Sequence, residues 1–231
     1  MHRLLLAIIV AALTGGSAGK TINKANPTAA EILRRTAQSY ASCKSYRDTG
    51  TVTSVGQNYR STLRFQTAFA RPDRFRFEYN TSKDDPDGPT RHVVWTRGGK
   101  AFSWWTVDPK VIEEDSLAMA VAGATGVSSM SAHTVPRLLM PGKVTGWAVT
   151  DLVSPRLLGT EPVDGAVCFE IEGHDWRGGT VTMWITKRSY LIRKIQHRHQ
   201  SKQDHFVDTT VYQPELDINL PASAFESRVE K

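Results

Sequence analysis

The chain has little of what most enzymes and membrane proteins display. Beyond its first eighteen residues, no apolar run approaches the length that spans a bilayer. The same part of the chain contains no Gly-x-Ser-x-Gly, no His-Glu-x-x-His and no glycine-rich phosphate loop. These absences argue against a membrane-spanning body and against the common hydrolase and nucleotide-binding sites, so we expect no enzyme activity and no cofactor.

The N-terminus is the one strongly apolar segment. His2-Arg3 is followed by the apolar run Leu4–Leu13 and by the small residues Gly16–Ala18. This order is typical of a secretory signal peptide over residues 1–18, and the other interpretation is a retained N-terminal anchor. No cysteine follows the run, so a lipid anchor on a new N-terminal cysteine is not available. We expect a protein that acts in the periplasm or otherwise outside the cytoplasm.

Residues 19–231 then form one domain of ordinary size, with 28 Lys and Arg against 23 Asp and Glu, which leaves a formal charge of +5. The excess of positive charge has two interpretations. The arginines either keep the polar faces of the protein solvated or attract anionic lipid headgroups. A nucleic-acid partner is not expected, since the chain carries no binding motif.

Cysteine is scarce. Cys43 and Cys168 are the only two, and an oxidising compartment favours pairing. A disulfide between them would join the N-terminal helix to a late strand. Two buried free thiols are the alternative.

One amphipathic helix opens the domain. Thr28 is a candidate cap with Glu31 three residues on, and apolar side chains recur at helical spacing from Ala29 to Ala41.

After Tyr46 the apolar period changes from that of a helix to that of a strand. In Arg74–Tyr79 aromatic side chains alternate with charged ones, and Leu63–Phe69 repeats the pattern. Similar patterns predict about ten strands, at Tyr46–Val55, Tyr59–Ala70, Asp73–Asn80, Arg91–Arg97, Ala101–Val107, Ala148–Leu158, Gly165–His174, Gly179–Thr186, Tyr190–Gln200 and Phe206–Tyr212.

A helical insert interrupts the strands over residues 110–141. Lys110–Ala122 and Val135–Met140 are predicted helices, and the intervening Gly, Ser and Met residues indicate a cover over the sheet. Sequential hairpins predict one antiparallel sheet. A sheet of about ten twisted strands cannot stay flat and must curl. We therefore predict a mainly β fold, an open half-barrel covered by the N-terminal helix and by this insert as a lid.

Several stretches together resemble the LolA/LolB-like periplasmic lipoprotein-carrier superfamily, closest to a little-characterised branch. They are residues 30–40, 45–50, 65–79, 182–186 and 190–195. The resemblance implies an open barrel whose apolar concave face accepts acyl chains under a helical lid. In the carrier an arginine on a strand holds the lid by hydrogen bonds. By location, Arg71, Arg74 and Arg91 are the candidates here.

The predicted cavity is lined by apolar and aromatic side chains, which an ordinary packed core would bury equally well. They are Leu63, Phe65, Phe69, Phe75, Phe77, Tyr79, Trp95, Trp104 and Met119.

A metal site is not expected. His197 and His199 share one strand face, and a third ligand would be needed for zinc or copper. A solvated strand end is the simpler interpretation.

Two functions follow. The first is an exported carrier or sensor that sequesters the acyl chains of a lipid or lipoprotein, with an envelope membrane protein as a further candidate partner. The second is a signalling or partner-binding module of the same fold, with a packed core and no ligand.

Overall fold

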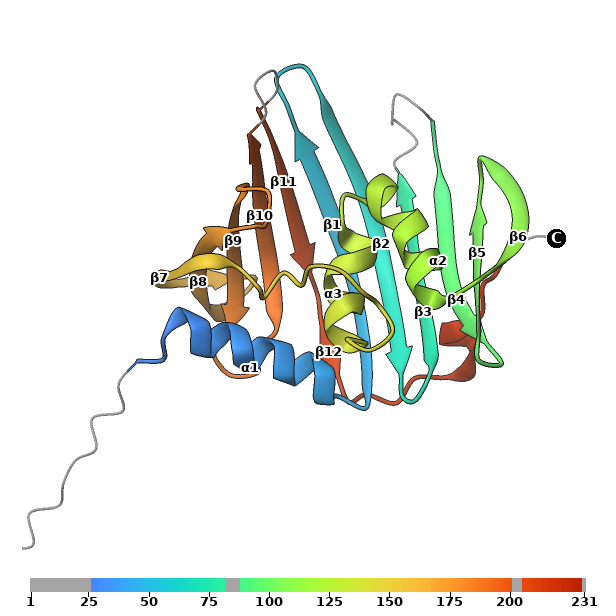
Figure 1. Cartoon of the computed structure of the whole chain (residues 1–231), viewed down its shortest axis with the longest axis horizontal. Coiled ribbons are helices and arrows are strands. Elements are labelled where there is room, and N and C mark those ends of the chain that lie inside the picture. Colours follow the sequence, from blue (N-terminus) through green and yellow to red (C-terminus); the bar gives the residue numbers. More distant parts are fainter. Residues whose placement is uncertain (1–25, 82–87, 201–204, 230–231) are drawn as a thin grey trace, which may run out of the picture.

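The computed structural model describes residues 26–81, 88–200 and 205–229 (Figure 1). The predicted signal peptide, residues 1–18, lies outside the described residues.

The strands form one antiparallel sheet in the order β6-β5-β4-β3-β2-β1-β11-β10-β9-β8-β7, with the short β12 paired to β1. The sheet is open, with β6 and β7 as its two edges, which confirms the predicted open, curved sheet. The strands are β1 Ser45–Val55, β2 Arg60–Ala70, β3 Arg74–Thr81, β4 Arg91–Arg97, β5 Lys100–Trp105, β6 Asp108–Glu114, β7 Val153–Val163, β8 Ala166–His174, β9 Thr180–Thr186, β10 Ile192–Gln200, β11 His205–Tyr212 and β12 Glu215–Leu216.

The first half of the sheet is joined to the second by β1 and β11. These strands are antiparallel, with Gly50 opposite Tyr212 and Val52 opposite Thr210. Residues more than 150 positions apart thereby share one continuous inner surface.

Helices cover one face of the sheet, which we call the inner face (Figure 1). The first, α1, runs from Ala29 to Ser42 and begins as predicted, because the Thr28 hydroxyl accepts a hydrogen bond from the Glu31 amide at 3.2 Å. The remaining helices are α2 Leu117–Thr125, the 3-10 turn η1 Gly126–Ser128 and α3 Ser131–Leu139. Their apolar sides and the inner face of the sheet form one continuous core.

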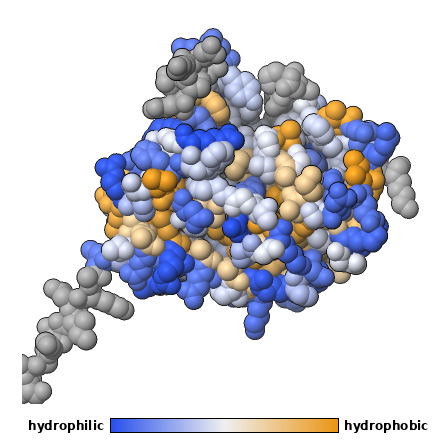
Figure 2. Space-filling model, in the orientation of Figure 1, coloured by the Kyte–Doolittle hydropathy of each residue, from blue (hydrophilic) through white to orange (hydrophobic). Residues whose placement is uncertain are grey.

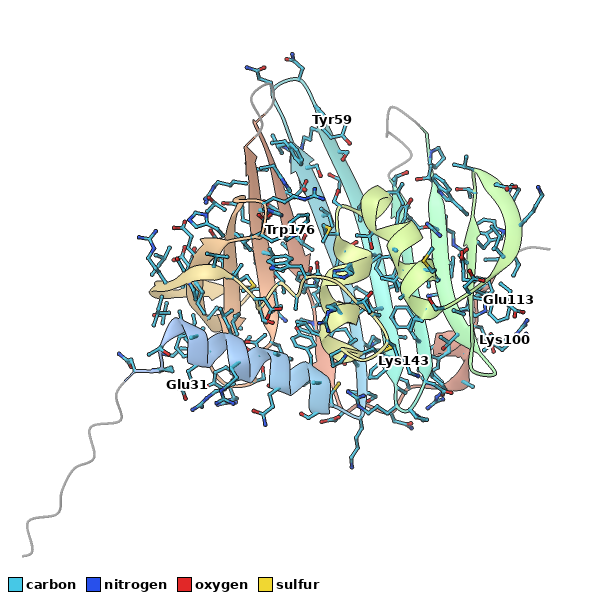
Figure 3. The ribbon with its side chains drawn as sticks, viewed as in Figure 1. Glu31, Tyr59, Lys100, Glu113, Lys143 and Trp176 are labelled. Carbon is cyan, nitrogen blue, oxygen red and sulfur yellow. The ribbon has the colours of Figure 1, made fainter. Side chains whose placement is uncertain are left out.

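The predicted helix Lys110–Ala122 is wrong in its first half. Residues Asp108–Glu114 form the edge strand β6, paired with β5, and α2 begins only at Leu117. Two acidic side chains of β6 have partners on the neighbouring strand β5. Glu113 pairs with Lys100 at 2.6 Å (Figure 3), and Glu114 accepts a hydrogen bond from the Ser103 hydroxyl.

The C-terminal segment packs on the opposite, outer face. Its short turn η2, Ala222–Phe225, buries Leu220 and Phe225 against Ala68 and Ala70 of β2. A further outer cluster contains Val93, Trp95, Phe102 and Trp104. The outer face is therefore also covered over β3–β5 and over the end of β2.

No helix in the described ranges is long and apolar enough to cross a membrane.

Candidate functional site

The inner face of β2 and β3 is an aromatic surface. Alternation places Phe65, Phe69, Phe75, Phe77 and Tyr79 on one side of the sheet, each at most 3% exposed. The Phe65 ring stacks on Phe77 with centroids 6.1 Å apart. Leu63 joins the same core. Six of the nine predicted cavity residues therefore lie together.

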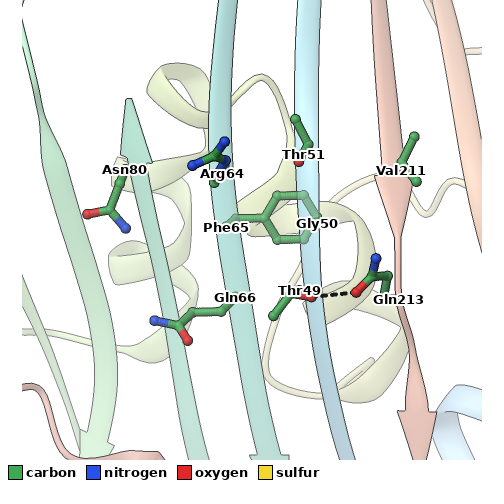
Figure 4. A pocket seen from close by; sticks show the side chains of 9 residues that line it. All are labelled: Thr49, Gly50, Thr51, Arg64, Phe65, Gln66, Asn80, Val211 and Gln213. Carbon is green, nitrogen blue, oxygen red and sulfur yellow. Dashed lines mark hydrogen bonds between the residues drawn. The ribbon is translucent and has the colours of Figure 1, made fainter. Parts of the chain in front are cut away.

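Gly50 lets this aromatic surface continue across the sheet. It lies opposite Phe65, whose ring extends over it toward Tyr212 at a centroid distance of 5.5 Å (Figure 4). A Cβ at Gly50 would come within 2.2 Å of the Phe65 ring. On the outer face, Gly50 is one of the residues that line an open depression of about 350 Å³, whose rim includes Arg64, Gln66 and the Thr49–Gln213 hydrogen bond.

A thin lid covers this surface. The sides of α2 and α3 that enter the core carry small or branched residues, which include Ala120, Val121, Ala124, Ala132 and Val135. The helices are joined through Ser129 and Met130, which both have left-handed backbone angles. The Ser129 hydroxyl lies 3.4 Å from the Ser54 hydroxyl on β1, so this joint meets the sheet through a polar contact.

Arg71 ties the end of the lid to the end of α1. Its Nε donates to the Cys43 carbonyl at 2.7 Å, and its Nη2 donates to the carbonyls of Ala41 and Leu139, the latter at 3.1 Å. The last carbonyls of a helix lack partners within the helix, so a guanidinium is well suited to both ends. Of the three candidate arginines, Arg71 is the one that contacts the lid.

The space between lid and sheet is filled. A cavity of about 30 Å³ lies between α3 and strands β9–β11, bounded by Met130, Val181, Ile195 and Tyr212. It is too small for an acyl chain, so the structure shows the lid closed on a packed core.

Three predicted cavity residues lie elsewhere, which corrects the prediction. Trp95 and Trp104 point to the outer face, where they pack with Val93 and Phe102. Both faces of β4 and β5 are buried, so apolar residues follow one another and alternation does not identify the inner set. Met119 is 57% exposed on the lid, because α2 turns it away from the core.

The predicted disulfide is absent, since both cysteines are free and buried. Cys43 belongs to the inner core, whereas Cys168 alternates along β8 with the inner residues Phe169 and Ile171 and so faces outward. Two thiols on opposite faces of a sheet cannot meet.

A buried carboxyl group lies beneath the junction of α1 and the lid. Asp48 is 1% exposed on the inner face of β1, and its Oδ2 accepts a hydrogen bond from the Tyr46 hydroxyl at 2.6 Å. Its Oδ1 has no hydrogen-bond partner in the described residues. Burial raises the pKa of Asp48 from about 3.8 to about 6. The sequence pattern does not indicate that the Asp48 carboxyl group is buried, so the group is recognised only in the folded structure.

The two strand histidines each pair with a different carboxylate. His197 lies 2.8 Å from Asp175 and His199 lies 3.1 Å from Asp208, with the two rings 3.8 Å apart. The described residues hold no group of three or more His, Cys, Asp or Glu side chains arranged to bind a metal ion. Within the same residues, no Ser or Cys side chain hydrogen-bonds to a histidine, so no nucleophile–base pair is assembled.

Comparison with known proteins identifies the fold. No protein-family model matches the chain, and no curated protein matches it significantly. Among solved structures the chain is similar to LprF from Mycobacterium bovis, at 9% identity and a TM-score of 0.52, over 87% of this chain and 97% of LprF. It is also similar to the MucA/MucB complex of Pseudomonas aeruginosa (12% identity, TM-score 0.48, covering 86% of this chain and 60% of that one). A LolA superfamily protein, NE2245 from Nitrosomonas europaea, matches at 14% identity and a TM-score of 0.35, over 87% and 98% of the two chains.

These similarities concern the fold alone. The assignment of the fold rests on LprF, whose TM-score is 0.52. The chain shares the LprF fold, and its open antiparallel sheet covered by helices confirms the fold that the sequence resemblance implied.

Proposed function

We propose that the protein is an extracytoplasmic binding protein that takes the acyl chains of a lipid or lipoprotein between its aromatic inner face and its lid. The observation that supports this most is the pairing of an extended aromatic surface with a cover of two nine-residue helices. A cover this thin can move while the sheet stays intact.

Apolar burial favours replacement of the contacts between the lid and the inner face by contacts with an acyl chain. Each methylene transferred from water into an apolar site contributes about 0.8 kcal/mol. The lid covers the aromatic surface with the side chains of Leu117, Leu138 and Leu139 as well as with smaller Ala and Val side chains, and a long acyl chain offers apolar area of the same kind. An acyl chain can therefore replace the contacts that α2 and α3 lose on opening.

The lid has one fixed end and one end suited to opening. Arg71 holds the C-terminal end of α3 beside α1. At the start of α3, the Ser129–Met130 joint between the two lid helices meets β1 through Ser54. We propose that the ligand enters at this joint, while the Arg71 hydrogen bonds limit how far the lid swings.

A photoreactive fatty acid tests this proposal. After ultraviolet crosslinking and peptide mass spectrometry, we expect labels on inner-face residues such as Phe77, Tyr79 and Val121. The outer-face residues Val93 and Trp104, which are also buried, are the internal control. Labelling of neither set, or of both equally, would contradict acyl binding on the inner face.

A second function is supported by the packed interior. The β6 edge exposes Val107, Val111 and Ile112 at 64%, 46% and 48%, and apolar surface is visible there in Figure 2. An unpaired strand edge with apolar side chains is suited to strand addition by a protein partner. A photoreactive fatty acid that labels nothing above background would favour this partner-binding module.

A further inference from the structure

A cleft of about 630 Å³ lies on the outer face, between the C-terminal segment, the β2–β3 turn and the β4–β5 turn. Three arginines line it, Arg74, Arg97 and Arg228. Trp95 and Phe225 supply aromatic walls. The sheet separates this cleft from the inner face, so what it binds is independent of the acyl proposal.

Two of the arginines are held in place by aromatic rings. The guanidinium carbon of Arg74 lies 4.7 Å from the centre of the Phe225 ring, and that of Arg97 lies 5.0 Å from the Phe102 ring. Stacking on an aromatic face orients a guanidinium while leaving its N–H groups free at the edges. In the described residues neither side chain donates a hydrogen bond or forms an ion pair, so their donors are available to a ligand.

A buried cluster next to the cleft is also positive. Arg76, 6% exposed, and Arg91 both pair with one carboxylate, that of Glu78. The Nε of Arg76 has no hydrogen-bond partner among the described residues. The cluster adjoins the cleft walls, because Arg76 lies opposite Trp95 in the sheet and Arg91 donates to the Ser227 and Arg228 carbonyls.

The charges do not balance. The cleft lining carries three arginines against Asp73 and Glu226, and the buried cluster carries two against Glu78, so five positive charges face three negative ones. Burial, together with Arg91 and Arg228, lowers the pKa of Arg76 to about 10. Arg76 and Arg91 share the single carboxylate of Glu78, so an anion bound in the adjoining cleft would reduce the local excess of positive charge.

We propose that this cleft binds a phosphate group, with the organic part of the ligand against Trp95 and Phe225. Guanidinium groups match phosphate oxygens through paired N–H donors, and several of them around one cleft suit an anion with three or four oxygens. The phosphate belongs either to a small soluble ester or to a lipid headgroup.

Titration with inorganic phosphate, followed by NMR of the tryptophan indole N–H groups, tests the cleft. Sedimentation with vesicles of phosphatidate in phosphatidylcholine, compared with phosphatidylcholine alone, distinguishes the two sources. Phosphate binding identifies soluble esters, and binding to the phosphatidate vesicles alone identifies a lipid headgroup.

The matched controls remove the same charge elsewhere. The double variant R74A/R97A should weaken binding at least about tenfold, whereas R60A/R188A, which removes two exposed arginines away from the cleft, should leave it within about twofold. Arg97→Gln alone, which disturbs only the contact with Phe102, should give an intermediate loss if the double variant unfolds. No binding to either probe, or equal losses in both double variants, would overturn the proposal.

Discussion

Arg71 donates a hydrogen bond to the carbonyl of Leu139 at 3.1 Å, 68 positions along the chain. The same guanidinium binds the carbonyls of Ala41 and Cys43 at the end of α1. One side chain on the β2–β3 turn thus joins the two helical covers of the inner face.

Replacing Arg71 should loosen the lid. In Arg71→Ala the last carbonyls of α1 and α3 lose a charged donor, which costs about 1–2 kcal/mol. We expect faster hydrogen exchange in Ser131–Leu139 with little change in the central strands, and tighter acyl binding because the closed lid competes less well.

The exposed Arg47, paired with Glu215, is the control for this experiment. Arg47→Ala should leave exchange in α3 unchanged, because exposed ion pairs contribute little. Unchanged exchange in Arg71→Ala as well would refute its role in holding the lid.

Stability should fall with rising pH because of Asp48. Its pKa is about 6 in the folded protein and about 3.8 when unfolded, so folding binds a proton between these values. This contribution is full below about pH 4, declines through pH 4–6 and is absent above. The difference of about 2 pKa units corresponds to roughly 3 kcal/mol.

Asp48→Asn isolates this contribution. The amide cannot ionise and still accepts from the Tyr46 hydroxyl, so urea unfolding should show a variant as stable as wild type near pH 4 and clearly more stable at pH 7.5. A constant difference across this range would mean that Asp48 is not the titrating group.

Gly50→Ala should destabilise the fold by about 1–3 kcal/mol. A new Cβ would lie 2.6 Å from the backbone oxygen of Val211 as well as against the Phe65 ring. Gly56→Ala, with its nearest contacts at 3.7 Å, is the matched control and should be nearly neutral in thermal unfolding. Equal effects at both positions would contradict the close packing at Gly50.

Both cysteines should titrate as free thiols. In denaturant, thiol reagents should count two per chain without prior reduction. In the native protein the reaction should be slow, since Cys43 and Cys168 are 3% and 0% exposed and burial raises the pKa of both thiols. A peptide that links Cys43 to Cys168 would show that the faces are assigned wrongly.

The sequence was most informative where apolar and polar side chains alternate regularly. Helix α1 and strands β1–β3 carry regular apolar patterns, so their bounds were predicted to within about one residue. On β4 and β5 the C-terminal segment also buries the outer face, and alternation could not assign Trp95 and Trp104. Strand β6 buries neither face and was mistaken for a helix.

The key polar contacts had no local signature. Arg71 was one of three candidates because its acceptors are backbone carbonyls at the ends of two distant helices. The isolation of Asp48 likewise depends on helices that converge only in the fold.

The most direct test of the account is a reversible lock on the lid. Ser54 and Ser129 have hydroxyls 3.4 Å apart, so S54C/S129C should form a disulfide between sheet and lid. Native mass spectrometry after incubation with acyl lipid would compare the oxidised and reduced forms. If acyl chains enter by opening of the lid, the oxidised S54C/S129C variant should bind no lipid and the reduced variant should bind as wild type does. Equal binding in both forms would show that acyl chains do not enter by opening this lid.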